Sequence, residues 1–509
     1  MLAKVISSAV VGVNGLLIEV ETDIAFGLPT FMTVGLPEGA VRESKDRVKA
    51  AIKNSGYEFP NRRITVNLAP ADVKKAGAGY DLPMALGILA ASETLVSDKL
   101  ARYGAIGELS LDGSIRPTQG ILPMALAVRD AGLAGLIVPK GNGAEAAVVR
   151  GIEIISVETL AQAVEFLAAK REIPPTVVDI DRIFIDNTIH AVDFAEVKGQ
   201  EHVKRALEIA AAGGHNVLMK GPPGSGKTMV ARRVPTILPD LSFEESLETT
   251  KIYSIMGLLP ENTGLLTVRP FKSPHHTISD AGLIGGGQIP RPGEVSLAHN
   301  GVLFLDELPE FKKNVLEVLR QPLEDGMVTI ARAASSLSFP ARFIMVAAMN
   351  PCPCGYLGDP QHECQCSPLQ IRRYENKISG PLLDRIDIHI EVPAVPVRDL
   401  TEHRDGEPSA TIKERVNQAR DIQKLRYQRH QHIHCNGQMG AREIKKHCKL
   451  DVNSLALLEK AVDRLGLSAR AYHRILKISR TIADLDGNDS ISTEHIGEAI
   501  QYRRQEQKQ

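Results

Sequence analysis

The segment from residue 221 to residue 228 constrains this chain more than any other part of its sequence. It follows the apolar run 217–219 and has the glycine spacing, the lysine and the threonine of a phosphate-binding loop. Such glycines let backbone N–H groups surround phosphate oxygens, while the lysine reaches the β- and γ-phosphates and the threonine hydroxyl binds Mg²⁺. We therefore expect a strand, this loop and a helix that together bind ATP and Mg²⁺. The loop residues are Gly221, Pro222, Pro223, Gly224, Ser225, Gly226, Lys227 and Thr228.

A second apolar run, 302–305, ends in two acids that suit the same site. We expect Asp306 to hold Mg²⁺ through its water shell and Glu307 to polarise the water that attacks the γ-phosphate. The alternative is a strand end that carries two solvated acids.

Two polar residues beside later apolar runs suit this reaction as well. Asn350 ends an apolar strand, where its amide can orient the attacking water. Arg385 precedes another strand, where it can neutralise charge on the γ-phosphate held by a neighbouring subunit, as arginine fingers do. The alternative for Arg385 is a structural salt bridge with Asp384 or Asp387.

The order of these motifs resembles that of the AAA+ ATPases, in their magnesium-chelatase-like and replicative-helicase branch, over residues 194–500. The resemblance implies an insert between Lys227 and Asp306, which lie far apart in this sequence. It also implies a β-hairpin shortly before Asn350, and residues 327–332 and 337–339 fit its two strands.

The same resemblance implies a helical lid and a ring. Arg470 lies where such proteins carry a lid arginine that senses the nucleotide, and Arg474, one helical turn later, is the alternative. Relatives of this branch assemble as hexameric rings with nucleotide at each interface, so a homo-hexamer is expected. Nucleotide state then moves the lid against the core, and loops in the pore pull on a polymer.

Four of the six cysteines form a cluster of two Cys-x-Cys pairs, which are Cys352 with Cys354 and Cys364 with Cys366. In a reducing compartment such a cluster points to metal, and four thiolates can enclose a structural Zn²⁺. The pairs are spaced more tightly than is usual for zinc, so buried thiols without metal are the alternative. His362 could replace one ligand.

The first part of the chain is similar to the Lon protease domain, an α/β domain of the ribosomal-S5-domain-2 type, at residues 67–82 and 106–117. In that family a serine nucleophile lies within the first segment and a lysine base follows the second. This chain has no serine at 76–81 and no lysine at 119–128. Acyl transfer therefore has no means to start, and binding or ring assembly is the expected role.

Length and pattern divide the 509 residues into more than one domain. We predict an α/β protein with four segments. They are a Lon-protease-like domain at 1–170, a linker at 171–193, an AAA+ core with magnesium-chelatase-type inserts at 194–396, and a helical lid at 397–509.

The composition is that of a globular protein, with 43% hydrophobic and 24% charged residues. The sequence lacks an apolar run of about 18 residues and a secretory leader, so we expect a cytoplasmic protein without a membrane partner. The formal net charge is −1, so any contact with nucleic acid must come from a local basic surface.

With both halves in this order, the chain is identified as a member of the magnesium-chelatase-like AAA+ ATPases of the ComM/YifB type. The resemblance implies a hexameric DNA helicase that acts on single-stranded and branched DNA, together with recombination proteins. It would promote branch migration when incoming DNA is recombined during natural transformation. One alternative is a chelatase-type motor that remodels a protein partner. An ATP-dependent protease is the other, and the missing serine and lysine argue against it.

Candidate DNA contacts are basic residues of the inserts and of the first lid helix. They would bind phosphates without reading sequence. The alternative for the lid residues is a solvated helix face, because acids are interleaved with them. The candidates are Arg269, Lys272, Arg332, Lys413, Arg415, Arg420, Lys424, Arg426 and Arg429.

Overall fold

The structure is a computed structural model of the chain, and its residues form two compact units. Unit 1 is made of Met1–Asn187 and Phe243–Thr267, and unit 2 of Thr188–Ser242 and Val268–Gln509. No helix in the described part of the chain is long and apolar enough to cross a membrane. The described residues are 1–75, 77–186, 191–260, 263–287, 290–332, 335–359, 362–394, 406–430 and 433–503.

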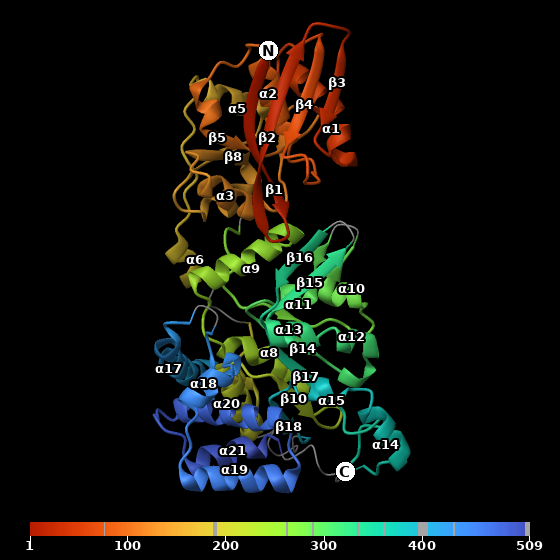
Figure 1. The fold of residues 1–509 in the computed structure, drawn as a ribbon, viewed down its shortest axis with the longest axis vertical. Coiled ribbons are helices and arrows are strands. Elements are labelled where there is room, and N and C mark those ends of the chain that lie inside the picture. Colours follow the sequence, from red (N-terminus) through yellow and green to blue (C-terminus); the bar gives the residue numbers. More distant parts are fainter. Residues whose placement is uncertain are drawn as a thin grey trace. The chain divides into compact units, whose positions relative to one another are not determined.

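Unit 1 is built on a mixed sheet of seven strands (Figure 1). Its strands are β1 (Leu2–Val11), β2 (Asn14–Ala25), β3 (Thr30–Val34), β4 (Arg63–Ala69), β5 (Tyr103–Ala105), β8 (Gly135–Pro139) and β9 (Glu153–Val157). Their order is β3-β4-β2-β1-β5-β8-β9, with β1–β2 and β2–β4 antiparallel and the remaining pairs parallel. A separate two-stranded ribbon pairs β6 (Glu108–Leu109) with β7 (Ile115–Arg116).

The described residues of unit 1 form six α-helices before residue 187, and several of them pack on this sheet. The six helices are α1 (Gly39–Asn54), α2 (Asp81–Ala91), α3 (Ile121–Asp130), α4 (Gly143–Ala147), α5 (Leu160–Leu167) and α6 (Ile180–Asp186). Nearly every residue of α2 is buried, since it packs on β1 and β2 and also contacts α1. Gly87 permits the close approach, because a Cβ there would lie 2.5 Å from Thr22 Oγ1. Small residues thus let α2 lie directly on the sheet.

Unit 2 contains a parallel sheet of five strands. The strands are β10 (Val217–Lys220), β11 (Phe271–Lys272), β14 (Val302–Leu305), β17 (Ile344–Met349) and β18 (Ile388–Glu391), in the order β11-β14-β17-β10-β18 (Figure 1). All of β14 and β17 is buried, which explains their unbroken apolar sequence. Helices α7 (Glu201–Gly213) and α8 (Lys227–Ile237) pack against this sheet.

The connections of unit 2 contain the predicted hairpin. Strand β15 (Met327–Arg332) pairs antiparallel with β16 (Ser335–Pro340), with Met327 opposite Pro340. The remaining elements are α10 (Asp280–Ile284), β12 (Gly285–Gly286), β13 (Arg291–Pro292), α11 (Glu294–Leu297), α12 (Lys313–Glu317), α13 (Arg320–Asp325), α14 (Pro368–Glu375) and α15 (Gly380–Leu383).

The chain after residue 405 is helical, as predicted for a lid. Its helices are α17 (Ser409–Tyr427), α18 (Ala441–His447), α19 (Val452–Leu465), α20 (Ala469–Leu485) and α21 (Thr493–Gln501). Asp451 caps α19 and Ser468 caps α20, each by accepting from a backbone N–H of the first turn. Helices α17 and α20 pack against α7, so lid and core share one hydrophobic core. The predicted boundary at 396 and 397 lies outside the described residues.

A helix between α8 and β11 packs with unit 1 although the chain reaches it from unit 2. This helix is α9 (Phe243–Met256), and it contacts α3. Ser254 donates to buried Glu145 at 2.5 Å, and its carbonyl accepts from the Gly120 N–H at 3.0 Å. The sequence predicts one continuous core at 194–396. In the structure, residues 243–267 belong to unit 1 by their contacts.

Candidate nucleotide site

Three neighbouring strands of unit 2 carry the predicted nucleotide residues at their carboxyl ends. Strand β10 leads into the loop at 221–226, β14 ends before Asp306, and β17 ends before Asn350. The three strands are parallel and adjacent, so their carboxyl ends meet at one edge of the sheet. Residues that are far apart in the sequence are thereby brought together.

The backbone of the phosphate loop requires its glycines. A Cβ at Gly221 would lie 2.1 Å from the Val392 carbonyl oxygen, so no side chain fits there. Gly224 and Gly226 have φ values of 75° and 85°, in the left-handed region that favours glycine. Gly226 is the N-cap of α8, so the positive end of this helix faces the loop.

Lys227 is buried and its Nζ lies inside the loop. It donates to the carbonyl oxygens of Gly221 at 2.7 Å and Pro222 at 2.8 Å, and to Asn350 Oδ1 at 3.3 Å. Burial lowers the pKa of Lys227, and the Asp306 carboxylate opposes this shift. A phosphate oxygen that replaced a carbonyl here would carry charge, so its hydrogen bond with the ammonium would be stronger.

The hydroxyl and the acid expected to bind Mg²⁺ are in contact. Thr228 Oγ1 donates to Asp306 Oδ2 at 2.6 Å, and Asp306 Oδ1 accepts from the Glu307 N–H at 3.0 Å. Hydroxyl and carboxylate oxygens are the hard ligands that Mg²⁺ prefers, so this pair fits the ion. Glu307 has φ 51°, which is rare for a residue other than glycine, and its side chain is 55% exposed.

One histidine contacts the Glu307 carboxylate, and the sequence did not predict a role for it. His276 Nδ1 lies 3.3 Å from Glu307 Oε2. The His276 ring lies against the His275 ring, with a centroid distance of 4.1 Å, and its other ring neighbour is Phe311 at 6.4 Å. The adjacent residues His275 and His276 are visible in the sequence. They lie far from Glu307 along the chain, so the contact could not be predicted.

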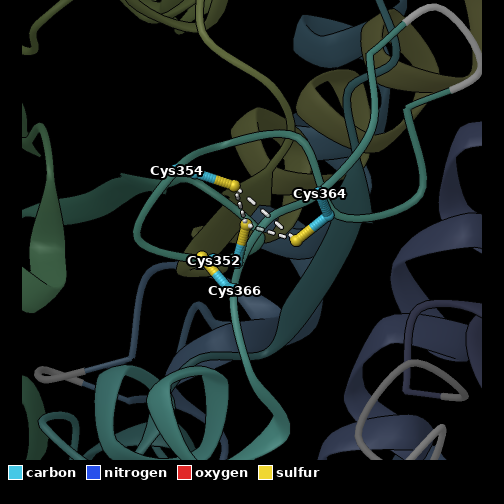
Figure 2. Close-up of side chains that lie close together, drawn as sticks. All are labelled: Cys352, Cys354, Cys364 and Cys366. Atoms are coloured by element: carbon cyan, nitrogen blue, oxygen red, sulfur yellow. Dashed lines mark hydrogen bonds between the residues drawn. The ribbon is translucent and has the colours of Figure 1, made fainter.

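The four clustered cysteines meet in one place, directly after Asn350. Figure 2 shows their side chains pointing toward one another from the loop that joins β17 to α14. The Sγ atom of Cys352 lies 3.3 Å from that of Cys354 and 3.7 Å from that of Cys364, and Cys354 and Cys364 are 3.6 Å apart. All four Sγ atoms lie within 4.8 Å of one another.

This arrangement fits a tetrahedral metal centre. Zn–S bonds of about 2.3 Å place the four sulfurs of a zinc site about 3.8 Å apart. The sulfur distances of the cluster lie close to that value. A hydrogen bond from the Tyr356 backbone N–H is the largest cause that lowers the pKa of Cys354, to about 6, whereas burial is the largest cause that raises the pKa of Cys364 and of Cys366. His362 contacts Asp359 instead, at 3.4 Å.

Comparison with known proteins finds matches over nearly the whole chain, including the residues of the nucleotide site. Residues 193–400 match the family described as "Magnesium chelatase, subunit ChlI", residues 20–142 match "Subunit ChlI of Mg-chelatase", and residues 406–503 match "Magnesium chelatase, subunit ChlI C-terminal". Competence protein ComM of Haemophilus influenzae is 45% identical over 504 residues, which cover 99% of this chain and 97% of that protein.

The chain belongs to the magnesium-chelatase-like AAA+ ATPases of the ComM/YifB type. The protein YifB of Escherichia coli is 44% identical over the same length. The magnesium-chelatase 38 kDa subunit of Rhodobacter capsulatus is 24% identical over 325 residues, which cover 60% of this chain. Membership of the family indicates ATPase activity, with ATP as nucleotide and Mg²⁺ as its metal.

In this ComM/YifB-type chain, Arg385 is buried and paired within its own unit. Its side chain is 5% exposed, forms an ion pair with Glu324 of α13 and donates to the Pro381 carbonyl at 2.6 Å. The Nε atom has no hydrogen-bond partner among the described residues. The salt-bridge partner is thus Glu324, not Asp384 or Asp387. To reach a neighbour's nucleotide, Arg385 would have to leave this pair.

The two candidate lid arginines have different surroundings. Arg470 is exposed in the first turn of α20. Arg474 forms an ion pair with Asp387, and its guanidinium also donates to the Arg385 carbonyl at 3.1 Å. Burial lowers the pKa of Arg474 to about 10. Arg474 therefore ties the lid to the segment that carries Arg385, while Arg470 is available to a ligand.

Most basic residues of α17 make contacts inside unit 2. They therefore form neither a free basic face nor a purely solvated one. Among these candidates, only Lys424 of α17 and Arg429, two residues beyond its end, stay exposed. The ion pairs are Lys413–Asp240 at 2.6 Å, Arg415–Glu407 at 2.5 Å and Arg426–Asp484 at 2.6 Å, and Arg420 donates to the Ala211 carbonyl at 3.0 Å.

The basic residues of the inserts also differ from one another. Arg269 donates to the carbonyl oxygens of Pro239 at 2.5 Å and Asn300 at 2.7 Å, so it fixes two loops of the core. Arg332, at the end of β15, is exposed. Arg332 is therefore the residue of the hairpin that can contact a phosphate.

Proposed function

We propose that the chain is an ATP-driven DNA motor that works as a homo-hexamer and promotes branch migration during recombination of incoming DNA. The meeting of Lys227, Asp306, Glu307 and Asn350 at one sheet edge carries the ATPase part of this proposal. The DNA part rests on the similarity over the full length to a protein named for competence. A cytoplasmic location belongs to the same proposal.

The residues of the site divide the work of hydrolysis. Lys227 binds the β- and γ-phosphates, and the loop N–H groups hold the phosphate oxygens. Glu307 accepts a proton from the attacking water, whose position Asn350 fixes. Mg²⁺, held from Thr228 and Asp306, would neutralise charge on the phosphates. Attack of the water on the γ-phosphorus of ATP breaks its bond to the β-phosphate oxygen, and release of ADP and phosphate then changes the contacts that hold the lid.

Ring assembly would supply the remaining cation. Arg385 of one subunit would contact the γ-phosphate held by the next subunit, after it leaves Glu324. This requirement makes turnover depend on the hexamer. Arg470, exposed on the lid, would contact the nucleotide from the subunit that binds it.

Exposed cations support the assignment of DNA as the polymer. Arg332 on the hairpin, Lys424 on α17 and Arg429 just after α17 can bind phosphates without reading bases. DNA binding should therefore weaken steeply as salt is raised.

A strand-displacement assay on forked and three-stranded DNA tests the function. Wild-type protein should displace strands with ATP, and Glu307→Gln should bind ATP and DNA without displacing strands. Addition of single-stranded DNA should stimulate ATP hydrolysis by the wild type. Intact hexamers that bind nucleotide but show neither displacement nor stimulation would contradict the proposal. That outcome would favour a chelatase-type motor acting on a protein partner.

We also propose that the four cysteines bind a structural Zn²⁺. The sulfur distances support this, because all four Sγ atoms lie within 4.8 Å of one another and two of the distances are close to that of a tetrahedral zinc site. Elemental analysis of purified protein should find about one zinc per chain, and Cys352→Ser should lower that content. Protein that carries no zinc after purification with added metal would end this assignment.

A further inference from the structure

The cysteine knuckle, residues 351–366, is joined to the phosphate loop at its beginning. The knuckle begins directly after Asn350, whose side-chain oxygen accepts from Lys227 Nζ at 3.3 Å. Cys352, two residues further on, is completely buried. A shift of the first cysteine would therefore move the residue that contacts the phosphate-binding lysine.

The middle of the knuckle lies against the phosphate loop itself. Gly355 has φ 88°, and a Cβ built on it would lie 2.6 Å from Pro223 Cδ and 3.0 Å from Pro223 Cγ. The backbone of the knuckle thus touches the ring of a loop residue with no room for a side chain between them. Gly355 sits one residue after Cys354, so this contact is fixed by the position of a cysteine.

The end of the knuckle is joined to the strand that precedes the loop. Ser367 follows Cys366 and starts α14 with a capping box, accepting from the Gln370 N–H. Glu375, at the end of α14, forms an ion pair with Lys220 at 2.8 Å. Lys220 is the last residue of β10, directly before Gly221. The knuckle is therefore held to the nucleotide site at both ends and in the middle.

We propose that metal binding at the knuckle positions the phosphate loop, so that Zn²⁺ and nucleotide bind cooperatively. This inference rests on the proposed zinc site. Four thiolates bound to one ion fix the knuckle backbone, and that backbone supports Pro223 and Asn350. Without the ion the same segment gains conformational freedom, which must be lost again when nucleotide binds. The coupling is reciprocal, so nucleotide must also raise the affinity for zinc by the same factor.

The first experiment measures both directions of the coupling on the full chain. Nucleotide affinity is measured with a fluorescent ATP analogue, before and after a chelator removes the metal. We expect binding about tenfold weaker without zinc, and restoration when zinc is returned. Release of zinc to a colorimetric chelator should be slower when ATP and Mg²⁺ are present. Equal nucleotide affinity with and without bound zinc would overturn the inference while leaving the zinc site intact.

A pair of glycine variants tests the contact without touching the thiols. Gly355→Ala places a methyl group against Pro223, whereas Gly358→Ala adds one where no atom lies within 4 Å. Both glycines have positive φ, 88° and 79°, so both variants carry similar backbone strain. Gly355→Ala should keep its zinc yet bind nucleotide about tenfold more weakly. Gly358→Ala should keep both.

The outcomes separate the two proposals. Protein without metal in every preparation removes the zinc site and the coupling with it. Zinc retained in both variants, with equal nucleotide affinities, removes the coupling alone. Thermal unfolding of each variant shows whether it is folded at the assay temperature.

Discussion

Asp81 and Glu145 of unit 1 and Lys227 of unit 2 are all buried charged residues, but the groups that they contact differ. In unit 1, Asp81 is completely buried and pairs with Arg47 at 2.7 Å, and it accepts from the Leu109 N–H as well. Glu145 accepts from the Leu122 N–H at 2.9 Å and from Ser254. These carboxylates are satisfied by their own chain, so they support packing rather than chemistry.

In unit 2, Lys227 and Glu307 lie beside the carboxyl ends of strands. Their partners differ from those of the unit 1 carboxylates. Lys227 rests on neutral carbonyl oxygens, and Glu307 is more than half exposed beside His276. A charged group held by weak partners at an edge is ready to exchange them for a ligand. A charged group therefore indicates a binding site when a ligand can replace its partners.

The largest expected effect comes from Arg385, whose burial resembles that of the unit 1 pairs. If it acts in trans, Arg385→Ala should lower turnover about 10³-fold while nucleotide binding and ring size persist. Mixing this variant with Lys227→Ala should restore part of the ATPase rate, because some interfaces then combine an intact loop with an intact arginine. A purely structural Arg385 would instead give a lower melting temperature and no rescue on mixing.

Glu307 is the next test of the contrast. Glu307→Gln should lower kcat about 10²-fold or more and leave bound ATP detectable in the isolated hexamer, because the general base is lost and the loop is not. Glu310→Gln, close by and exposed with its pair Lys377, is the matched control and should turn over ATP at the wild-type rate. Similar rates for the two variants would remove the assignment of the base.

His276 should have a smaller effect on the same step. His276→Ala frees the Glu307 side chain, so kcat should fall about tenfold with little change in KM. His275→Ala keeps the direct contact with Glu307 and should fall less. The result against this role is a change in KM alone, or equal effects of the two substitutions.

The smallest effect on turnover is expected from a substitution in unit 1, and it tests the comparison between the units most directly. Asp81→Ala should destabilise unit 1 by about 3 kcal/mol, because Arg47 and the Leu109 N–H lose their partner. ATPase activity per folded molecule should stay unchanged. The control is Asp130→Ala in the exposed pair with Arg129, expected to cost less than about 0.5 kcal/mol. Thermal unfolding and ATPase rates measure both, and a loss of turnover in the folded protein would break the contrast.

The motifs of local sequence were predictable. A phosphate loop, an acid after a strand and an amide after a strand each follow from adjacent residues. The strand order that brings Thr228, Asp306 and Asn350 together is a finding of the structure. The family resemblance implied the hairpin, and residues 327–332 and 337–339 fit its strands.

Contacts between distant segments were not predictable from one sequence. Nothing in α17 shows that its cations pair with acids of other elements, as Lys413 does with Asp240. The same holds for Glu324 as the partner of Arg385 and for His276 beside Glu307. The membership of α9 in unit 1 depends on packing against α3, which no local period encodes.

Helix α9 changes what the connection between the two units can transmit. The chain crosses from one unit to the other at residues 187–188, 242–243 and 267–268, so the units share three covalent links rather than a single tether. The second link follows the end of α8 by five residues, and the third leads into β11. A single proteolytic cut between residues 187 and 188 would therefore leave residues 243–267 covalently joined to unit 2, and residues 1–187 would be held to them by packing alone.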